Sequence, residues 1–483
     1  MTKAVVVGSG PNGLAAAVAL AQQGIAVTVL EAQHRIGGGT RSSELTVPGV
    51  LHDECSGIHP VAVGSPFLST LGLDRYGLTW RWPEIDAAHP LDDGSAGVLY
   101  RSVEQTAAGL GVDGRVWRAL FGASVRGADE LLPSFLGPVL KIPRHPIRLA
   151  RFGLAGLPPA TVTARLFRTA AGRALFAGNI AHSFYRLDRP MTPVIGMGIV
   201  VAGHRHGWAV AKGGSRAITD ALAALLTELG GTIETGVRVR SLAELAASHP
   251  AEITMLDVAP GAVAELAGDR LPPRVRRAYL RYRHGPAAFK VDYAVSGGVP
   301  WTNEAVRKAG TVHLGGTFEQ VAAAEADCAR GRLPARPFVL VGQQHLADPG
   351  RSAGDVHPLY AYAHVPNGYA GPAGQLTELV TTQIERFAPG FRDRIVASVS
   401  TSLAAFEAHN ANNVGGDIIG GLSNARQIVL RPRPALDPYR TGIPGVYLCS
   451  QSTPPGAGAH GMCGYHAAQS ALRALRRGPS ATG

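Results

Sequence analysis

A glycine turn near the N-terminus constrains this sequence more than any other feature. The apolar run 4–7 is followed at once by glycines in the spacing GxGxxG, namely Gly8, Gly10 and Gly13. An Ala- and Leu-rich stretch to Gln23 predicts a helix that Gly24 ends, and a second apolar run leads to Glu31. This order predicts a strand–turn–helix–strand unit of about 30 residues, so the chain begins with a parallel sheet.

The turn has the composition that a bound dinucleotide needs. Its first glycine permits the tight turn, its second lets a pyrophosphate approach the backbone, and its third lets helix and strand pack closely. The helix start presents free N–H groups to the phosphates. Glu31 is placed to accept hydrogen bonds from ribose hydroxyls, and its carboxylate repels a 2′-phosphate, which disfavours NADP.

A second glycine cluster follows the acid. The stretch EAQHRIGGGTR contains Gly37, Gly38 and Arg41. It resembles the extended signature of the glutathione-reductase-2 class of flavoproteins, which implies FAD rather than NAD as the cofactor. The added glycines allow backbone contact with a second stretch of the cofactor, and the arginine can reach the diphosphate with two donors.

The C-terminal region repeats the pattern of strand, glycine-rich loop and helix. Residues 445–450 predict a strand, PPGAGAHG follows, and a helix is expected from about Met462 to Arg476. In this flavoprotein class the last helix points its N-terminus at the flavin. The resemblance therefore implies cofactor contacts from Ser450, Gly461 and Met462, and from Val237 in the middle of the chain. Ser450 and Gln451 replace the usual glycine and acid, so contact there falls to backbone or hydroxyls.

The sequence is most similar to the phytoene-desaturase-like family, in its pyridine-nucleotide–disulfide-oxidoreductase-domain branch. The matching pieces span the chain: GSGPNGLAAA, EAQHRIGGGTRS, DECSGIHP, KGGSRAI, FKVDYA, HNANNVGGDIIGG and YLCSQSTPPGAGAHGMCGYHAA. The resemblance implies an α/β fold. Residues 1–75, 205–260 and 425–483 are expected to form a Rossmann-type FAD-binding domain. Residues 76–204 and 261–424 are expected to form an inserted substrate domain, with a mixed sheet and a helical cap around 130–190.

The activity implied by the resemblance is that of an FAD-dependent oxidoreductase. The expected reaction is a desaturation or dehydrogenation that moves hydride from an apolar polyene, isoprenoid or lipid-like substrate to flavin N5. The same cofactor cradle also serves a redox-neutral cis–trans isomerase or a saturase that uses reduced FAD. An amine oxidase and a non-catalytic flavoprotein are further alternatives. The motifs specify neither the electron acceptor nor the oligomeric state.

Three side chains are candidates for catalysis. His59, in DECSGIHP, is a possible general base, since an unperturbed histidine titrates near neutrality; the alternative is a hydrogen-bonded loop histidine. His460 flanks the final turn. Lys290 is an isolated lysine that either holds a water near N5 or is a solvated strand residue. No metal site is expected, because the remaining histidines lack ligand spacing.

Composition excludes several other classes of protein. Hydrophobic residues make up 46% and charged residues 17%, which excludes a disordered chain. The apolar run Pro193–Gly203 is too short for a membrane span. The net charge of +11 comes without a reader motif for nucleic acid, so no such partner is expected. Four scattered cysteines fit a reducing cytoplasm.

One segment has an unusual charge pattern. Between Glu130 and Asp188 there is no acidic residue, whereas Lys141 and several arginines lie among Leu, Phe, Ile and Pro. Such a segment is able to lie on a lipid surface with its apolar side inserted. A helical cap whose arginines face water or a substrate cleft is the equally weighted alternative.

Overall fold

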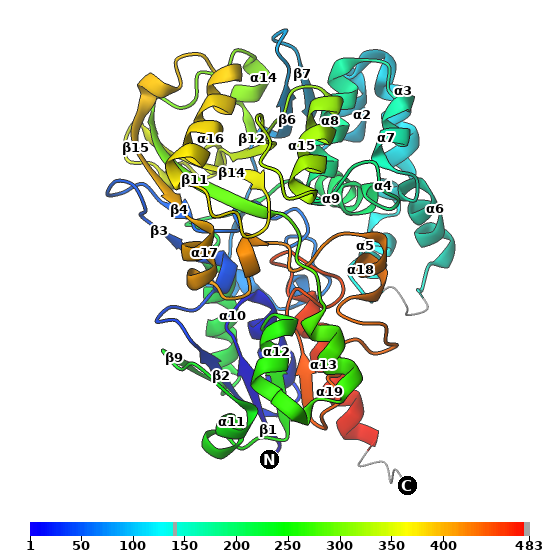
Figure 1. Cartoon of the computed structure of the whole chain (residues 1–483), viewed down its shortest axis with the longest axis vertical. Coiled ribbons are helices and arrows are strands. Elements are labelled where there is room, and N and C mark those ends of the chain that lie inside the picture. Colours follow the sequence, from blue (N-terminus) through cyan, green and yellow to red (C-terminus); the bar gives the residue numbers. More distant parts are fainter. Residues whose placement is uncertain (139–142, 478–483) are drawn as a thin grey trace.

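Five parallel strands form the sheet that contains the N-terminal unit. In a computed structural model that describes residues 1–138 and 143–477, their order is β16 (Val446–Leu448), β10 (Ile253–Leu256), β1 (Lys3–Val7), β2 (Ala26–Glu31) and β9 (Thr232–Thr235). Stretches far apart in the sequence therefore build one sheet, which lies at the N-terminal end of the molecule (Figure 1). The α/β class expected from the sequence is confirmed.

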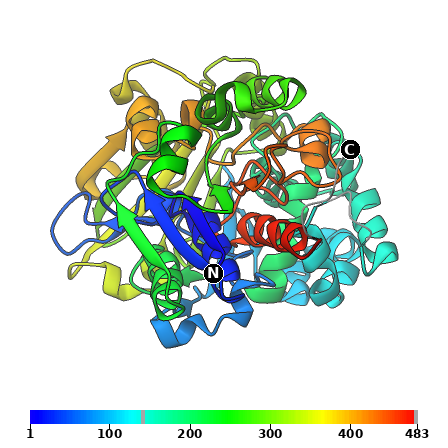
Figure 2. The same cartoon turned by 90° about the horizontal axis from the view of Figure 1, so that it is seen from below.

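The two faces of this sheet bury alternate residues of each strand. Ala4 and Val6 pack against α1 (Pro11–Ala21), α10 (Arg216–Glu228) and α19 (Met462–Arg477), and the last of these lies beside the blue strands in Figure 2. Val5 and Val7 pack against α11 (Leu242–Ser248), α12 (Pro260–Ala267) and α13 (Pro273–Leu280). The last two helices belong to the range 261–424 expected in the substrate domain, yet their apolar faces cover the five-stranded sheet.

The second sheet is mixed and has seven strands. Its order is β15 (Ile395–Thr401), β11 (Ala287–Ser296), β14 (Val356–Val365), β13 (Val339–Gly342), β12 (Ala309–Leu314), β6 (Ile85–Pro90) and β7 (Ala96–Leu99), with only β12 and β6 paired in parallel. Phe289, Val291 and Tyr293 of β11 point to the core under α16 (Ala373–Phe387). The period of two leaves Lys290 and Asp292 on the opposite face.

Helices cover that opposite face as a cap. They are α2 (Val103–Gly109), α3 (Gly114–Trp117), α4 (Ala123–Arg126), α5 (Ala128–Phe135), α6 (Pro146–Gly156), α7 (Ala160–Thr163), α8 (Ala170–Ala181) and α9 (Pro193–His206), together with α15 (Phe318–Ala329). The cap is thus wider than 130–190, and Lys141 lies outside the described residues. Within the described ranges no helix has both the length and the apolar content to cross a bilayer.

Shorter elements complete the chain. They are β3 (Ser42–Ser43), β4 (His52–Asp53), β5 (Trp80–Arg81), β8 (Val210–Ala211), α14 (Glu304–Arg307), α17 (Leu403–His409) and α18 (Ala425–Leu430).

A buried ion cluster joins the two sheet regions. Arg351, only 1% exposed, bonds the Asp53 carboxylate at 2.5 Å and Asp348 at 3.1 Å, and donates to the Ala211 carbonyl at 2.7 Å. Asp53 also accepts the N–H of Ser215 at 2.7 Å, at the start of α10. Burial alone would raise the pKa of Asp53, but Arg351 and these hydrogen bonds hold it below its usual value.

Candidate cofactor and active site

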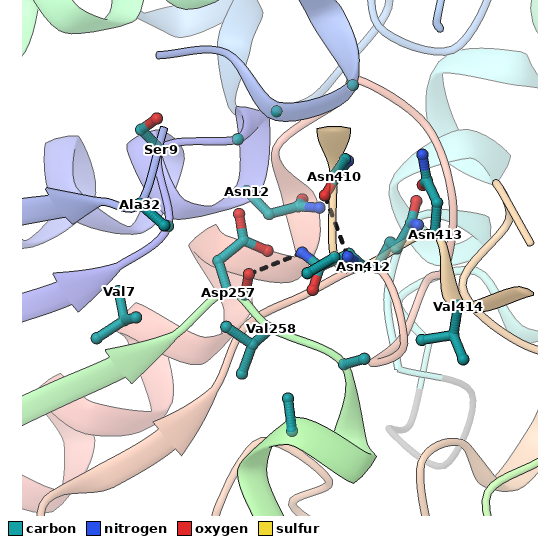
Figure 3. Close-up of a pocket in the computed structure, with 18 of the residues that line it drawn as sticks. Val7, Ser9, Asn12, Ala32, Asp257, Val258, Asn410, Asn412, Asn413 and Val414 are labelled. Atoms are coloured by element: carbon teal, nitrogen blue, oxygen red, sulfur yellow. Dashed lines mark hydrogen bonds between the residues drawn. The ribbon is translucent and has the colours of Figure 1, made fainter. Parts of the chain in front are cut away.

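A cavity of about 790 Å³ opens along the carboxyl ends of β1, β2 and β10. Its volume is typical of a site for a whole organic cofactor. Residues from widely separated stretches line it, including the glycine turn, Glu31, Val237, the Asn-rich loop 410–413 and Gly458. Figure 3 shows Ser9, Asp257 and Asn412 among the lining residues. Of the cofactor residues expected from the sequence, six line this cavity: Gly8, Gly10, Glu31, Gly38, Arg41 and Val237.

The glycine turn leaves the start of α1 open. Gly8 has a φ of +104°, and a Cβ on Gly13 would lie 2.1 Å from the Gly8 carbonyl oxygen. Gly10 is the N-cap residue and supplies no side-chain cap. Asn12 lines the cavity, and its buried Oδ1 has no hydrogen-bond partner among the described residues. A side chain at these glycine positions would fill the cradle. Without one, the space fits a diphosphate at the N-terminus of the helix.

Glu31 is fixed at the edge of the cavity by backbone and hydroxyl donors. Its Oε2 accepts the N–H of Ser9 at 3.0 Å and the Ser9 hydroxyl at 2.6 Å, and its Oε1 accepts the N–H of Gln33 at 2.8 Å. Val237 donates its N–H to the Glu31 carbonyl at 2.8 Å, which brings β2 and the segment after β9 together. The carboxylate is therefore pre-oriented for ribose hydroxyls.

The second glycine cluster packs on the first. A Cβ on Gly38 would lie 3.0 Å from Gly10 Cα, and Gly37 has a φ of +114°, so both positions favour glycine. Arg41 donates to the His409 carbonyl at 3.0 Å and lies 3.6 Å from Glu31. Burial lowers the pKa of Arg41, and the Glu31 carboxylate opposes this shift. Its guanidinium thus lies at the cavity wall with a carboxylate partner already present.

Asp257 is a cavity residue that sequence reasoning missed. It follows β10, accepts the Gly13 N–H at 2.9 Å, and receives the Asn412 side-chain N–H on its backbone carbonyl at 2.9 Å (Figure 3). Burial raises the pKa of Asp257 to about 7, against the Gly13 hydrogen bond and with help from Glu31. The end of a parallel strand beside β1 was the available signal, because ligands bind at that edge.

The Asn-rich loop was also underestimated. The sequence HNANNVGGD suggests turn structure, yet His409, Asn410, Asn412 and Asn413 all line the cavity. Asn412 donates its backbone N–H to the Asn410 side chain at 3.2 Å (Figure 3). The loop therefore supplies polar groups from the far side of the cavity.

The C-terminal residues act differently from the expectation. Gln451, Gly458 and Ala459 line the cavity, whereas Ser450, Gly461 and Met462 do not. A Cβ on Gly461 would lie 2.7 Å from the Ala15 Cβ, so this glycine lets α19 approach α1. Met462 is the first residue of α19 and is packed in the core of the five-stranded sheet. Ser450 Oγ is buried and has no partner.

His59 is buried beside the cavity rather than in its wall. Its Nε2 lies 2.8 Å from the Ser215 hydroxyl, so Ser215 stands at the N-cap position of α10 but does not cap the helix with its side chain. Burial lowers the pKa of His59 to about 4. The ring is consequently neutral near pH 7.

His460 and Lys290 also lie outside the cavity lining. His460 Nδ1 accepts the N–H of Met462 at 3.0 Å, and burial lowers its pKa to about 4. Lys290 is 3% exposed, forms an ion pair with Asp292, and lies 4.5 Å from the ring centre of Tyr360. The interpretation as a solvated strand lysine is therefore wrong. Tyr360 in turn donates its hydroxyl to the carbonyl of Cys55, which does line the cavity.

The described ranges contain no group of three or more His, Cys, Asp or Glu side chains able to hold a metal ion. The cavity offers a glycine cradle, an uncapped helix start and a pre-oriented carboxylate. These groups fit a dinucleotide with a ribose and a diphosphate, and they come from both ends of the chain, as expected for FAD.

Comparisons with known proteins agree with this geometry. Residues 6–65 match the family model described as an NAD(P)-binding Rossmann-like domain. The chain is 24% identical to pyridine nucleotide-disulfide oxidoreductase domain-containing protein 2 of Mus musculus, over 98% of this chain and 94% of that protein. It is 25% identical to phytoene dehydrogenase of Streptomyces griseus, over 82% and 78% of the two chains.

Solved structures extend the similarity to the whole fold. A putrescine oxidase variant redesigned in its cofactor binding has a TM-score of 0.61 at 15% identity, covering 99% of both chains. At this identity the likeness shows a shared fold.

Proposed function

We propose that this chain, an FAD-dependent oxidoreductase similar to phytoene dehydrogenase, desaturates an apolar polyene, isoprenoid or other lipid-like molecule. FAD supplies the ring that accepts a hydride at N5. The chain's own contribution is to bind that cofactor between its two ends and to place a C–H bond of the substrate beside it.

The apolar contact between the cofactor cavity and the cap carries this proposal. Ile418 lines the cavity and also packs against the hydrophobic core between the cap helices and the seven-stranded sheet. Cys55 lines the same cavity, and burial raises its thiol pKa to about 12, so the thiol is neutral. Tyr360 and Tyr362 continue this surface along β14. Because an apolar side chain and a neutral thiol join the cavity to this aromatic core, the contact favours a substrate with little polarity.

The titratable side chains nearest this contact already have hydrogen-bond or ion-pair partners. His59 is bonded to Ser215, His460 accepts a backbone N–H, and Lys290 is paired with Asp292. We propose that Lys290 and His460 position the backbone near the cofactor, and that His59, which is neutral because burial lowers its pKa, takes the second proton as a weak base. A weak base is sufficient, because loss of hydride from an allylic C–H bond leaves a cation that readily gives up a proton.

Anaerobic reduction tests the proposal directly. The purified holoprotein is mixed with polyenes and isoprenoids of graded length, and loss of the oxidised flavin absorption band is followed. A desaturase bleaches the flavin and yields a product lighter by two hydrogens. Bleaching by amines alone would overturn the proposal, as would flavin that no lipid-like compound reduces.

Product mass separates the redox-neutral alternative. An isomerase or saturase that uses reduced FAD gives a product of unchanged mass or one heavier by two hydrogens. An amine oxidase would favour a pair of aromatic side chains beside the flavin near the C-terminus. The tyrosines there, Tyr447 and Tyr465, do not line the cavity, and Tyr465 stacks on Phe67 at 4.5 Å.

We infer a reducing compartment, with the cytoplasm as the simplest choice. All four cysteines, Cys55, Cys328, Cys449 and Cys463, are buried and free of disulfides. Burial raises the thiol pKa of each, so all four are poor thiolates. Recovery of the protein from a cell fraction with a compartment marker checks this assignment.

A further inference from the structure

Five large apolar side chains on the outer part of the cap are left exposed by the described part of the chain. They are Ile147, Leu154, Leu157, Val162 and Leu166, between 48% and 68% exposed. The described residues contain fifteen exposed side chains of this kind, and these five fall within 147–166 while the others are scattered. They lie on α6 and the residue that follows it, Leu157, on α7 and on the 3₁₀ turn Ala164–Leu166, at the outer edge of the cap (Figure 1). We call them the α6 surface.

Helix α6 has apolar residues on the side where a solvated helix carries polar ones. Its inner side packs Phe152 and Leu149 against the cap core. Ile147, Arg151 and Leu154, spaced i, i+4 and i+7, share the outer side, and all three are exposed. Apolar clusters of this kind on a surface mark a site of contact with a membrane or a partner.

The charge around the α6 surface is mainly positive, and the carboxylates at its border, Glu130 and Asp188, are paired with arginines. Arg144, Arg151, Arg165 and Arg168 are exposed, and none forms an ion pair with another described residue. Glu130 marks the border of the surface, where its carboxylate binds Arg148 and His145. Unpaired guanidinium groups beside apolar side chains complement an anionic surface that has an apolar layer beneath it, and a lipid bilayer has both.

We propose that the α6 surface docks the protein onto anionic lipid bilayers. The five apolar side chains enter the boundary between headgroups and acyl chains, and the four arginines contact lipid phosphates. The elements are short and lie in the plane of contact, so the attachment is peripheral and reversible. It stands independently of the proposed reaction, because it rests on the exposed residues of the cap alone.

Vesicle sedimentation of the full-length holoprotein tests the proposal. We expect binding to vesicles of phosphatidylcholine mixed with phosphatidylglycerol, weaker binding to phosphatidylcholine alone, and release as salt is raised. Ile147→Glu with Leu154→Glu should weaken binding at least about tenfold, since two inserted side chains are lost. Arg151→Gln or Arg165→Gln should each weaken it about fivefold at low salt.

The matched control is Val396→Glu with Leu436→Glu, which places two charges on exposed apolar positions elsewhere. This variant should bind vesicles as the parent does. Flavin content and unfolding temperature verify that each variant is folded. Equal vesicle binding by the α6 variants and the parent would overturn the proposal. The proposal would also be overturned if the parent protein did not bind vesicles but formed a dimer that Ile147→Glu dissociates. That result would assign the surface to contact with a second copy of the chain.

Discussion

The cofactor side and the cap side of this molecule are built by different means. The cofactor cradle depends on backbone: glycines at Gly8, Gly10, Gly13 and Gly38, and an open helix start. The cap side depends on side chains from distant segments. Four histidines are brought together there from β6, the C-terminal end of α8, β12 and β14, namely His89, His182, His313 and His364. A backbone cradle tolerates almost no added atom, whereas a side-chain surface can be repacked.

Substitution in the buried ion cluster between the two regions should have the largest effect on the free energy of unfolding. Arg351→Met leaves Asp53 and Asp348 buried without their cation, and we expect a loss of about 3–5 kcal/mol in the free energy of unfolding. Denaturant titration with fluorescence measures it. The folded-state pKa of Asp53 is lowered, so its contribution is fully present above the ordinary value of 3.8 and is lost as the pH falls below it, through the folded-state pKa.

Adding Asp53→Asn to the Arg351→Met variant removes the stranded charge. The double variant should recover part of the lost stability. Equal stability of the single variant and the parent would contradict the view that this cluster holds the two regions together.

A methyl group in the cradle should have the next largest effect. Gly13→Ala places a Cβ 2.1 Å from the Gly8 carbonyl oxygen, so the turn must shift. We expect a cost of about 1–3 kcal/mol and a protein that purifies without flavin. Gly374→Ala, on a helix with open space around the new Cβ, is the control and should keep both flavin and stability. Retention of flavin by Gly13→Ala would contradict the cradle's rigidity.

The acid beside the cradle should make cofactor affinity depend on pH. The pKa of Asp257 is raised to about 7, mainly by burial, and the carboxyl faces Glu31 and the neutral Cys449 thiol. A diphosphate placed nearby favours the protonated acid, so binding takes up a proton above pH 7. The dissociation constant of FAD should then rise by up to about tenfold per pH unit.

Asp257→Asn should remove this pH dependence, which titration of flavin fluorescence quenching measures. By the same linkage, the charge destabilises the cofactor-free fold as the pH rises through 7, so the variant should be the more stable protein there. A pH slope that persists in the variant would assign the proton to another group.

The cap side should show the smallest effect. His182 and His313 bond each other at 3.0 Å, and burial lowers the pKa of both, so both are neutral. Replacing the pair together by leucine removes both partners of one hydrogen bond, and stability should change by less than about 1.5 kcal/mol. Calorimetric unfolding measures the change. A loss as large as that of Arg351→Met would show that the two regions are equally intolerant.

The sequence predicted the cofactor half well because its signals are local. The glycines, Glu31 and the apolar runs specify a strand–turn–helix–strand unit through conformations and contacts within about 40 residues. The FAD expectation is confirmed, and so are the parallel sheet and the final helix.

Sequence patterns could not predict contacts between side chains that lie far apart in the sequence. Asp257 reaches the glycine turn from 244 positions away along the chain, and Asn412 reaches Asp257 from 155 positions away. The prediction of a solvated Lys290 failed because no local sequence pattern indicates that Asp292 and Tyr360 enclose its side chain. Met462 fits the motif for a cofactor contact, yet packing of α19 against α1 turns it into the core.

The linear order of residues determined the parallel sheet and the open helix start, because both follow from the steric freedom of glycine and the period of apolar residues. The identity of the dinucleotide followed from the resemblance of the second glycine cluster to a flavoprotein signature. Tertiary structure alone decided which polar groups meet in the cavity, which candidate bases are buried, and which apolar residues of the cap remain exposed. These depend on how separate segments pack, since burial and charge pairing are properties of the assembled fold rather than of any one segment.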